Sequence, residues 1–310
     1  MRIEEKEALL KKFAGESEEG KQAEATSENA ATAANAENPG ESEGSITGEA
    51  QVKPSFIDTH GHFDDPSFDA DRDELLEAMH DFGVLNIVNC ATDVKSCKST
   101  LKLMKRYPWL YGAMGIHPHE VKGIDEDAIS AVYTFAEENE RVCAIGEIGL
   151  DYHYDFSPRD EQQDWFIEQI ELAKELELPI IVHSREAAKD TMDIIRDYEA
   201  ERVGGVIHAY SGDLEMAEEY VRMGFYLGIG GMVTFPKVKK LIRVVEGIPL
   251  EHLLLETDSP YMTPVPNRGK RNDSRQIVHV AAKIAEIKGI SVSKVYEVTT
   301  QNAKRFFGIK

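Results

Sequence analysis

Residues 142–183 read "VCAIGEIGLDYHYDFSPRDEQQDWFIEQIELAKELELPIIVH". Two short apolar runs, 142–148 and 179–183, stand at its ends. Between them, residues 159–176 are rich in charge and place their apolar side chains at the spacing of an amphipathic helix. Runs that are apolar at nearly every position are typical of strands buried on both faces, as in a parallel sheet. The stretch therefore predicts one strand–helix–strand unit of an α/β protein.

The same alternation continues in both directions, from Pro54 to the C-terminus. Eight such units in about 250 residues match a closed (β/α)8 TIM barrel better than an open sheet. No repeat of longer period indicates a solenoid. The predicted strands are 55–58, 84–90, 110–116, 142–148, 179–183, 204–208, 225–230 and 252–257; the predicted helices are 70–82, 94–106, 126–139, 159–176, 186–199, 213–223, 236–246, 273–288 and 291–300.

Residues 1–52 have a different composition, rich in Ala, Glu, Ser, Gly and Asn, with 12 acidic and 5 basic residues. Such a segment cannot bury enough apolar surface to offset the entropy lost on ordering. We therefore predict a disordered acidic tail over 1–52, in which residues 3–13 could form a short helix, and a barrel domain over 53–310.

Composition limits the compartment and the partners. Cys90, Cys97 and Cys143 form no CxxC pair and are too few for a disulfide framework, which favours a reducing compartment, and we expect a cytoplasmic protein. No apolar run has the length of a membrane span, so no membrane partner is expected. A net charge of -21 argues against a broad, non-specific grip on nucleic acid. A local site is still open, because divalent cations can supply positive charge where a phosphate lies.

Polar residues stand at the strand ends, where a barrel of this kind builds its active site. His60 and His62 follow the first strand and, if the backbone stays extended, project to one side, where they could hold one cation. Surface or hydrogen-bonded core histidines would give the same pattern, so this pair alone is a weak signal. Glu147 follows an interior apolar run, where an unpaired carboxylate is costly to bury. It needs either a cation or an arginine or lysine from a neighbouring loop.

Two further strands each end in a single histidine, His183 and His208. Either alone could be a satisfied core residue, but two in consecutive strands favour a shared role. Asp258 follows the last strand, where it could also cap a turn. These groups offer only nitrogen and oxygen, which suits Zn, Mn or Mg, and six ligands fit two divalent cations that share a bridging carboxylate. The predicted metal ligands are His60, His62, Glu147, His183, His208 and Asp258.

The chain from about 55 to 308 resembles the TatD family of metal-dependent deoxyribonucleases, within the amidohydrolase-like barrels. The motifs that carry the resemblance, in order, are DTHGHFD, GIHPHE, GEIGLDYHYDFSPRDEQ, PIIVHSREA, HAYSGD, LLLETDSPYMTPVPNRGKRN and NAKRFFGI. The resemblance implies that the six predicted ligands occupy the metal positions of the family. It also implies that Glu147 bridges the cations and that Asp258 acts in proton transfer, so that these two are the catalytic residues. Ala209, His153 and the RNDS of 271–274 depart from the family pattern, which concerns the shape of the substrate mouth.

The implied activity is hydrolysis of DNA phosphodiester bonds by metal-activated water, on single strands or strand ends, with exonuclease action expected. His117 lies in the loop after the third strand, and we predict that it contacts the substrate. Arg268 and Arg271 lie in a basic loop after Asp258, where arginine could hold a phosphate through two hydrogen bonds. A turn-stabilising histidine and a solvated loop are the alternatives.

Two other functions fit the same residues. The metal pair could hydrolyse another ester, lactone, amide or aminoacyl-tRNA bond, or the chain could be a metal-stabilised binding protein without turnover. Related phosphotriesterase-like barrels have a carboxylated lysine after the fourth strand, whereas this chain has Glu147 and no lysine over 142–150. That difference favours the TatD family.

Overall fold

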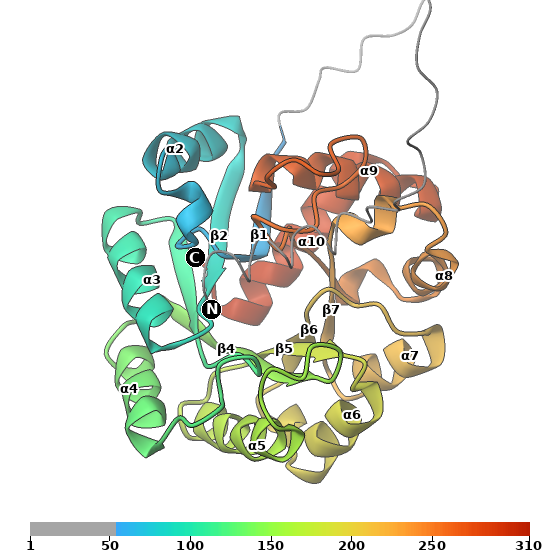
Figure 1. The fold of residues 1–310 in the computed structure, drawn as a ribbon. Helices are drawn as coiled ribbons and strands as arrows, with labels where there is room; N and C mark the ends of the chain where they lie inside the picture. The colour runs from blue at the N-terminus through green and yellow to red at the C-terminus, as the bar shows by residue number, and fades with distance from the viewer. Residues whose placement is uncertain (1–53) are drawn as a thin grey trace, which may run out of the picture. The chain divides into compact units, whose positions relative to one another are not determined.

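The structure is a computed structural model that describes residues 54–310. The predicted tail over 1–52, with its helix over 3–13, lies outside the described residues. Within them, eight parallel strands form one sheet in sequence order, and helices surround it (Figure 1). The strands are β1 (Phe56–Gly61), β2 (Val84–Cys90), β3 (Leu110–Met114), β4 (Val142–Asp151), β5 (Ile180–Arg185), β6 (Gly205–Ile207), β7 (Tyr226–Ile229) and β8 (Leu253–Leu255).

The first and last strands approach each other beyond the end of β8 and bring the sheet to a nearly closed barrel. Gly61 forms a parallel bridge with Ser259. The backbone N–H of His62 donates to Ser259 O at 2.8 Å, and that of Asp258 donates to His60 O at 2.9 Å. These bonds confirm the predicted (β/α)8 barrel and bring the ends of β1 and β8 side by side.

All nine predicted helices are present, and apart from the end of the last one their ends lie within four residues of the predicted positions. The largest difference is at the last helix, which was predicted to end at residue 300 and instead continues to Phe307, because its last turns are buried against the strands. Gly308 ends it with a φ of 64°. The helices are α2 (Arg72–Phe82), α3 (Val94–Arg106), α4 (Glu126–Glu137), α5 (Arg159–Glu175), α6 (Ala188–Asp197), α7 (Leu214–Arg222), α8 (Lys239–Gly247), α9 (Ile277–Lys288) and α10 (Val292–Phe307).

Three strands continue past their predicted ends: β1, β4 and β5, the last to Arg185. The extensions of β1 and β4 carry site residues. β1 was predicted to end at residue 58 but remains extended to Gly61. β4 was predicted to end at residue 148 but continues to Asp151, because its pairing with β5 goes on through Gly149, Leu150 and Asp151. A side chain at Gly149, where φ is +135°, would place Cβ 2.1 Å from His183 O, so glycine is what permits this close pairing.

The apolar core has two layers, as expected for strands with both faces buried. One cluster lies between the strands and the helices, and it includes Ile87, Ile180 and Leu253. The neighbouring strand residues Val88, Ile181 and Leu254 belong to a second cluster with Ala303, Phe307 and Ile309. The second cluster is the barrel interior, and the C-terminal end of α10 fills it from the side opposite the strand ends.

Within residues 54–310, no helix combines the length and the apolar character that a bilayer crossing requires.

Candidate metal centre

The extension of β1 brings two imidazoles together in an edge-to-face arrangement, with ring planes 76° apart. His60 Nε2 and His62 Nε2 are 3.2 Å apart, and both side chains are buried. His62 Nδ1 lies 2.8 Å from the backbone oxygen of Cys90 at the end of β2. Because a carbonyl oxygen only accepts, this nitrogen must carry the hydrogen, and the Nε2 of a neutral His62 turns a lone pair toward His60.

Glu147, on β4, lies between two groups of histidines and is 3 % exposed. Its Oε2 is 3.2 Å from His60 Nε2 and 3.6 Å from His62 Nε2. Its Oε1 is 2.9 Å from His183 Nδ1 and 3.7 Å from His117 Nε2. Among the described residues no arginine or lysine forms an ion pair with it, so a structural salt bridge does not explain this buried carboxylate. One oxygen faces each histidine group, as a bridging ligand requires.

His208 and Asp258 complete the group around β1. The His208 ring stacks on that of His60 with centroids 3.5 Å apart. Asp258 Oδ1 is 3.4 Å from His62 Nε2 and 3.7 Å from His208 Nε2. Asp258 has a left-handed φ of 59°, and Ala209, after His208, has a φ of 44°. Non-glycine residues in this region are uncommon and cluster at functional sites.

Each of three histidines has an acceptor at the nitrogen that faces away from the cluster. For His62 this acceptor is Cys90 O. Asp151 Oδ2 lies 3.0 Å from His183 Nε2, and Glu256 Oε1 lies 3.2 Å from His208 Nδ1. The last contact has the distance of an ion pair without the angle of a hydrogen bond. Such partners fix the tautomer and the ring orientation of metal-binding histidines.

Asp151 and Glu256 were not among the site residues predicted from the sequence. Asp151 stands four residues after Glu147 and Glu256 two residues before Asp258, so the extended period of two could have indicated both. Glu256 is 1 % exposed, and its Oε1 also accepts from the N–H of Ala209 at 2.7 Å. Its two contacts tie the end of β8 to the end of β6.

The carboxylates dominate the proton affinity of these histidines. Burial by itself lowers the pKa of His62, but the hydrogen bond to Asp258 and the charge of Glu147 outweigh it and raise the pKa to about 9. At His183, Asp151 and Glu147 likewise outweigh burial and raise the pKa to about 9. At His208, Glu256 does the same and raises the pKa to about 9. Burial opposes the charge of Glu147, yet the surrounding imidazoles hold its pKa well below the usual range. In the absence of a cation, protons on the histidines therefore balance the negative charge of the carboxylates.

His117 differs from the other histidines of the cluster. Its Nδ1 accepts from the backbone N–H of His119 at 3.2 Å, so in the neutral ring the hydrogen is on Nε2. Burial, with His119 and His183 nearby, holds the pKa of His117 well below its usual range. A neutral ring with Nε2–H facing the cluster is a hydrogen-bond donor. This is the chemistry of a substrate contact, the predicted role, which stays a prediction.

The two predicted arginines lie on loops after β8. Arg271 donates to both carboxylate oxygens of Asp71, at 2.8 and 2.6 Å, and to Ser67 O. Arg268 lies over the Phe235 ring, 4.2 Å from its centroid. Arg271 therefore joins two loops and would have to share or leave Asp71 to hold a phosphate. The predicted substrate role of both arginines stays a prediction.

The donor set of this centre fits divalent cations. Three triads each bring their ligand atoms within 4.8 Å of one another: His60, His62 and Asp258; His60, Glu147 and His208; and His117, Glu147 and His183. Imidazole and carboxylate groups suit Zn and Mn, and Mg where oxygen predominates. The lone pair on His62 Nε2 faces another imidazole and two carboxylates in a buried space. Only protons or cations can balance the negative charge of these carboxylates there.

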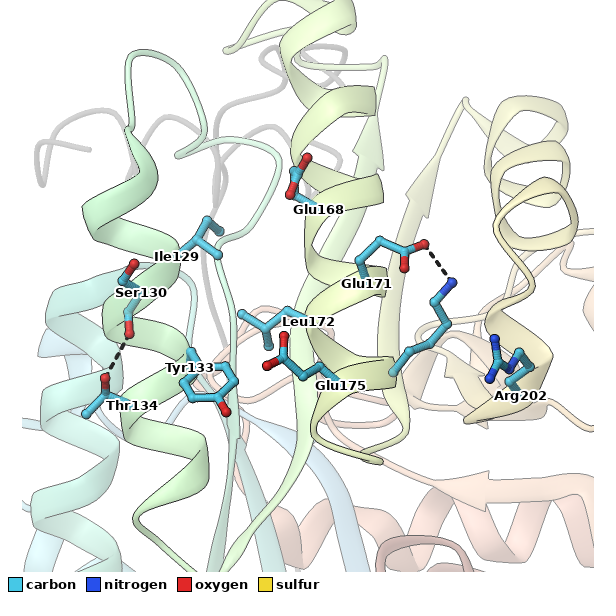
Figure 2. A pocket seen from close by; sticks show the side chains of 10 residues that line it. Ile129, Ser130, Tyr133, Thr134, Glu168, Glu171, Leu172, Glu175 and Arg202 are labelled. Carbon is cyan, nitrogen blue, oxygen red and sulfur yellow. Dashed lines mark hydrogen bonds and ion pairs between the residues drawn. The ribbon is translucent and has the colours of Figure 1, made fainter.

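A groove on the outer surface has none of this chemistry. It lies between α4 and α5, away from the strand ends, and Figure 2 shows Glu168, Glu171 and Glu175 along its α5 side. Lys174, which also lines it, pairs with Glu171 at 2.6 Å. Its carboxylates would repel a phosphate, so the strand ends are the better candidate for a phosphoester site.

A barrel with histidines and carboxylates gathered at the carboxyl ends of its strands is the architecture of a metal-dependent hydrolase. Residues 57–308 match the family described as TatD related DNase, and the chain belongs to this family. It is therefore a TatD-family metal-dependent hydrolase.

Similar proteins are found in bacteria and in humans. The chain is 41 % identical to the uncharacterized metal-dependent hydrolase YabD of Bacillus subtilis, an alignment that covers 82 % of this chain and 99 % of YabD. It is 35 % identical to human Deoxyribonuclease TATDN3, over 81 % of this chain and 94 % of that protein. The crystal structure of YJJV, a TatD homolog from Escherichia coli, superposes with a TM-score of 0.78 at 33 % identity, covering 82 % of this chain and 98 % of YJJV.

Proposed function

We propose that this protein hydrolyses phosphodiester bonds of DNA with two divalent cations, Zn, Mn or Mg. The observation that carries the proposal is the position of Glu147, whose two carboxylate oxygens face different histidine groups. A carboxylate placed in this way can bridge two cations, and the described residues supply no arginine or lysine as an alternative partner. The residues that would hold the cations are His60, His62, Glu147, His183, His208 and Asp258.

Cations bound here would supply Lewis acidity to a phosphoryl oxygen and lower the pKa of a water molecule. The residues of the chain would do the rest. The Asp258 side chain is 21 % exposed, whereas that of Glu147 is 4 % exposed. Asp258 is therefore the carboxylate that water can reach, and its Oδ1 would accept a proton from water and pass it to the leaving oxygen. His117 Nε2–H, which faces Glu147 at 3.7 Å, would donate to a phosphoryl oxygen.

Two features support DNA, and single strands or strand ends in particular. The family carries the DNase description, and the human relative is named a deoxyribonuclease. The candidate ligands lie deep in the barrel mouth, with His60 at 0 % and His208 at 6 % exposed. A strand end or a flexible single strand can lower one phosphate into such a site more readily than a continuous duplex can. We propose exonuclease action, because a strand end enters such a site most readily.

The test is cleavage of end-labelled single- and double-stranded DNA by purified protein freed of metal and then supplied with Zn, Mn or Mg. We expect cleavage only with a cation, faster on single strands, and lost in Glu147→Gln, which keeps the side-chain shape but removes the charge. Product ladders from 5′- and 3′-labelled strands distinguish exonuclease from endonuclease action. Turnover of p-nitrophenyl esters, lactones or aminoacyl-tRNA with no cleavage of DNA would overturn the proposal.

A further inference from the structure

The loop between β4 and α5, residues 152–158, carries an exposed aromatic pair. Phe156 is 43 % exposed, which is more than the other large apolar side chains of residues 54–310. Its ring stacks on that of Tyr154, with centroids 5.3 Å apart and planes 19° from parallel. Single exposed apolar side chains are common on protein surfaces, so the surroundings of this ring decide whether it has a role.

This pair is held in place by polar contacts on both sides. Asp151 Oδ1 accepts from the backbone N–H of His153 at 3.0 Å and of Tyr154 at 2.8 Å, which fixes the start of the loop. Ser157 Oγ donates to His119 O at 3.2 Å and accepts from Lys122 N–H at 3.1 Å, which fixes its end. A ring on a loop fixed at both ends is ordered before any ligand arrives, so little entropy is lost on binding.

The pair lies next to the metal centre. The His119 ring meets the Phe156 ring edge-on at 4.9 Å between centroids, and it meets the His117 ring in the same way at 4.3 Å. The same Asp151 carboxylate that fixes the loop also faces His183, through its other oxygen. The exposed ring is therefore two ring contacts away from the group proposed to contact the phosphate.

We propose that Phe156, with Tyr154 stacked behind it, is a platform on which one base of a single-stranded DNA substrate stacks while the adjacent phosphate enters the metal centre. The proposal rests on the proposed function and names how the site selects its substrate. Stacking on aromatic rings is the usual way in which proteins hold single strands without reading their sequence. Bases inside a duplex stack on their neighbours, so an unpaired base reaches the ring more readily.

The experiment uses the full chain and a single-stranded oligonucleotide with phosphorothioate linkages that resist cleavage. One 2-aminopurine is moved through the sequence, and its fluorescence is recorded as protein is added. We expect quenching at one position, and an affinity about five- to 150-fold weaker for Phe156→Ala. Phe156→Leu keeps an apolar side chain without a ring and should lose as much, whereas Phe156→Trp should retain the quenching.

Tyr198→Ala is the matched control, because Tyr198 is 37 % exposed but lies after α6, at the opposite end of the barrel from the loop that carries Phe156. It should bind as the wild type does. An abasic residue at the quenched position should weaken binding to the wild type, and the difference between wild type and Phe156→Ala should then disappear. Phe156→Leu that binds like the wild type, or a difference that persists without the base, would overturn the platform.

The same data separate this proposal from the proposed function. If the wild type binds with the expected quenching but cleaves no DNA under any cation, the nuclease proposal fails and the platform stands as a binding site. If the wild type cleaves DNA and all Phe156 variants bind with its affinity, the platform fails and the nuclease proposal stands.

Discussion

Cation binding to this centre should release protons, and should therefore become stronger as the pH rises. Neighbouring carboxylates raise the pKa of His62, His183 and His208 to about 9. Removing the proton from a group with a pKa of about 9 costs about 2.7 kcal/mol at pH 7 and about 1.4 kcal/mol at pH 8. For each proton that leaves, we expect the apparent cation affinity to rise about tenfold per pH unit between pH 7 and 9.

The metal-free protein should show the opposite dependence. A histidine whose pKa is higher in the folded than in the unfolded chain stabilises the fold fully below its unfolded pKa of about 6.5. That stabilisation is lost as the pH rises through the folded value of about 9. Between pH 6.5 and 9 the metal-free protein should lose stability while the stabilisation by a cation grows.

Thermal unfolding of EDTA-treated protein at pH 6, 7 and 8, with and without Mn²⁺, measures both trends. A cation at 100 times its Kd adds about 2.7 kcal/mol to the free energy of unfolding, which is about 5–11 °C in Tm for a domain of this size. Titration calorimetry in buffers of different ionisation enthalpy counts the protons released. A Tm increase that is the same at all three pH values, or a release of no protons, would refute the reasoning. Glu147→Gln should lose most of the cation effect.

Three further predictions concern single side chains. Asp151→Asn and Glu256→Gln should each weaken cation binding about 10- to 100-fold, because each removes the charge that orients a histidine; equilibrium dialysis measures this, and unchanged affinity would argue against that role. Arg268→Ala should reduce the slope of log affinity against log salt by about 0.7 for single-stranded DNA if the arginine binds a phosphate, and an unchanged slope would exclude that contact. Phe307→Ala should lower the free energy of unfolding by about 3–5 kcal/mol in chemical denaturation, because its side chain is 5 % exposed inside the barrel, while cation affinity per folded molecule stays the same.

The strands and the side chains at their ends could be predicted because both depend on local sequence. A strand buried on both faces must be apolar at nearly every position, so a histidine or carboxylate that ends such a run is conspicuous. The barrel rule then places all these ends at one mouth. His60, Glu147 and His208 were predicted in this way. In the structure one potential ligand atom from each lies within 4.8 Å of those of the other two.

What the sequence did not reveal depends on contacts between distant loops. Arg271 and Asp71 are 200 residues apart, and nothing local to either indicates that they pair. The hydrogen on His117 Nε2 follows from the His119 N–H, a consequence of how the backbone turns there. The length of α10 was underestimated because residues 301–307 contain several polar side chains, and only the barrel interior explains why Ala303 and Phe307 are buried.

The charge of the chain bears on how it could hold DNA at all. Residues 1–52 carry 12 acidic and 5 basic residues, which leaves 44 acidic and 30 basic residues over 53–310, a net charge of -14. A protein with this balance cannot draw much affinity from the release of counterions along a nucleic acid. In the proposed function the attraction is therefore local, from cations that would offset the carboxylates at the barrel mouth and from the proposed stacking on Phe156. A site built in this way would favour a short unpaired segment over a long duplex, because only the few nucleotides at the mouth contribute to binding.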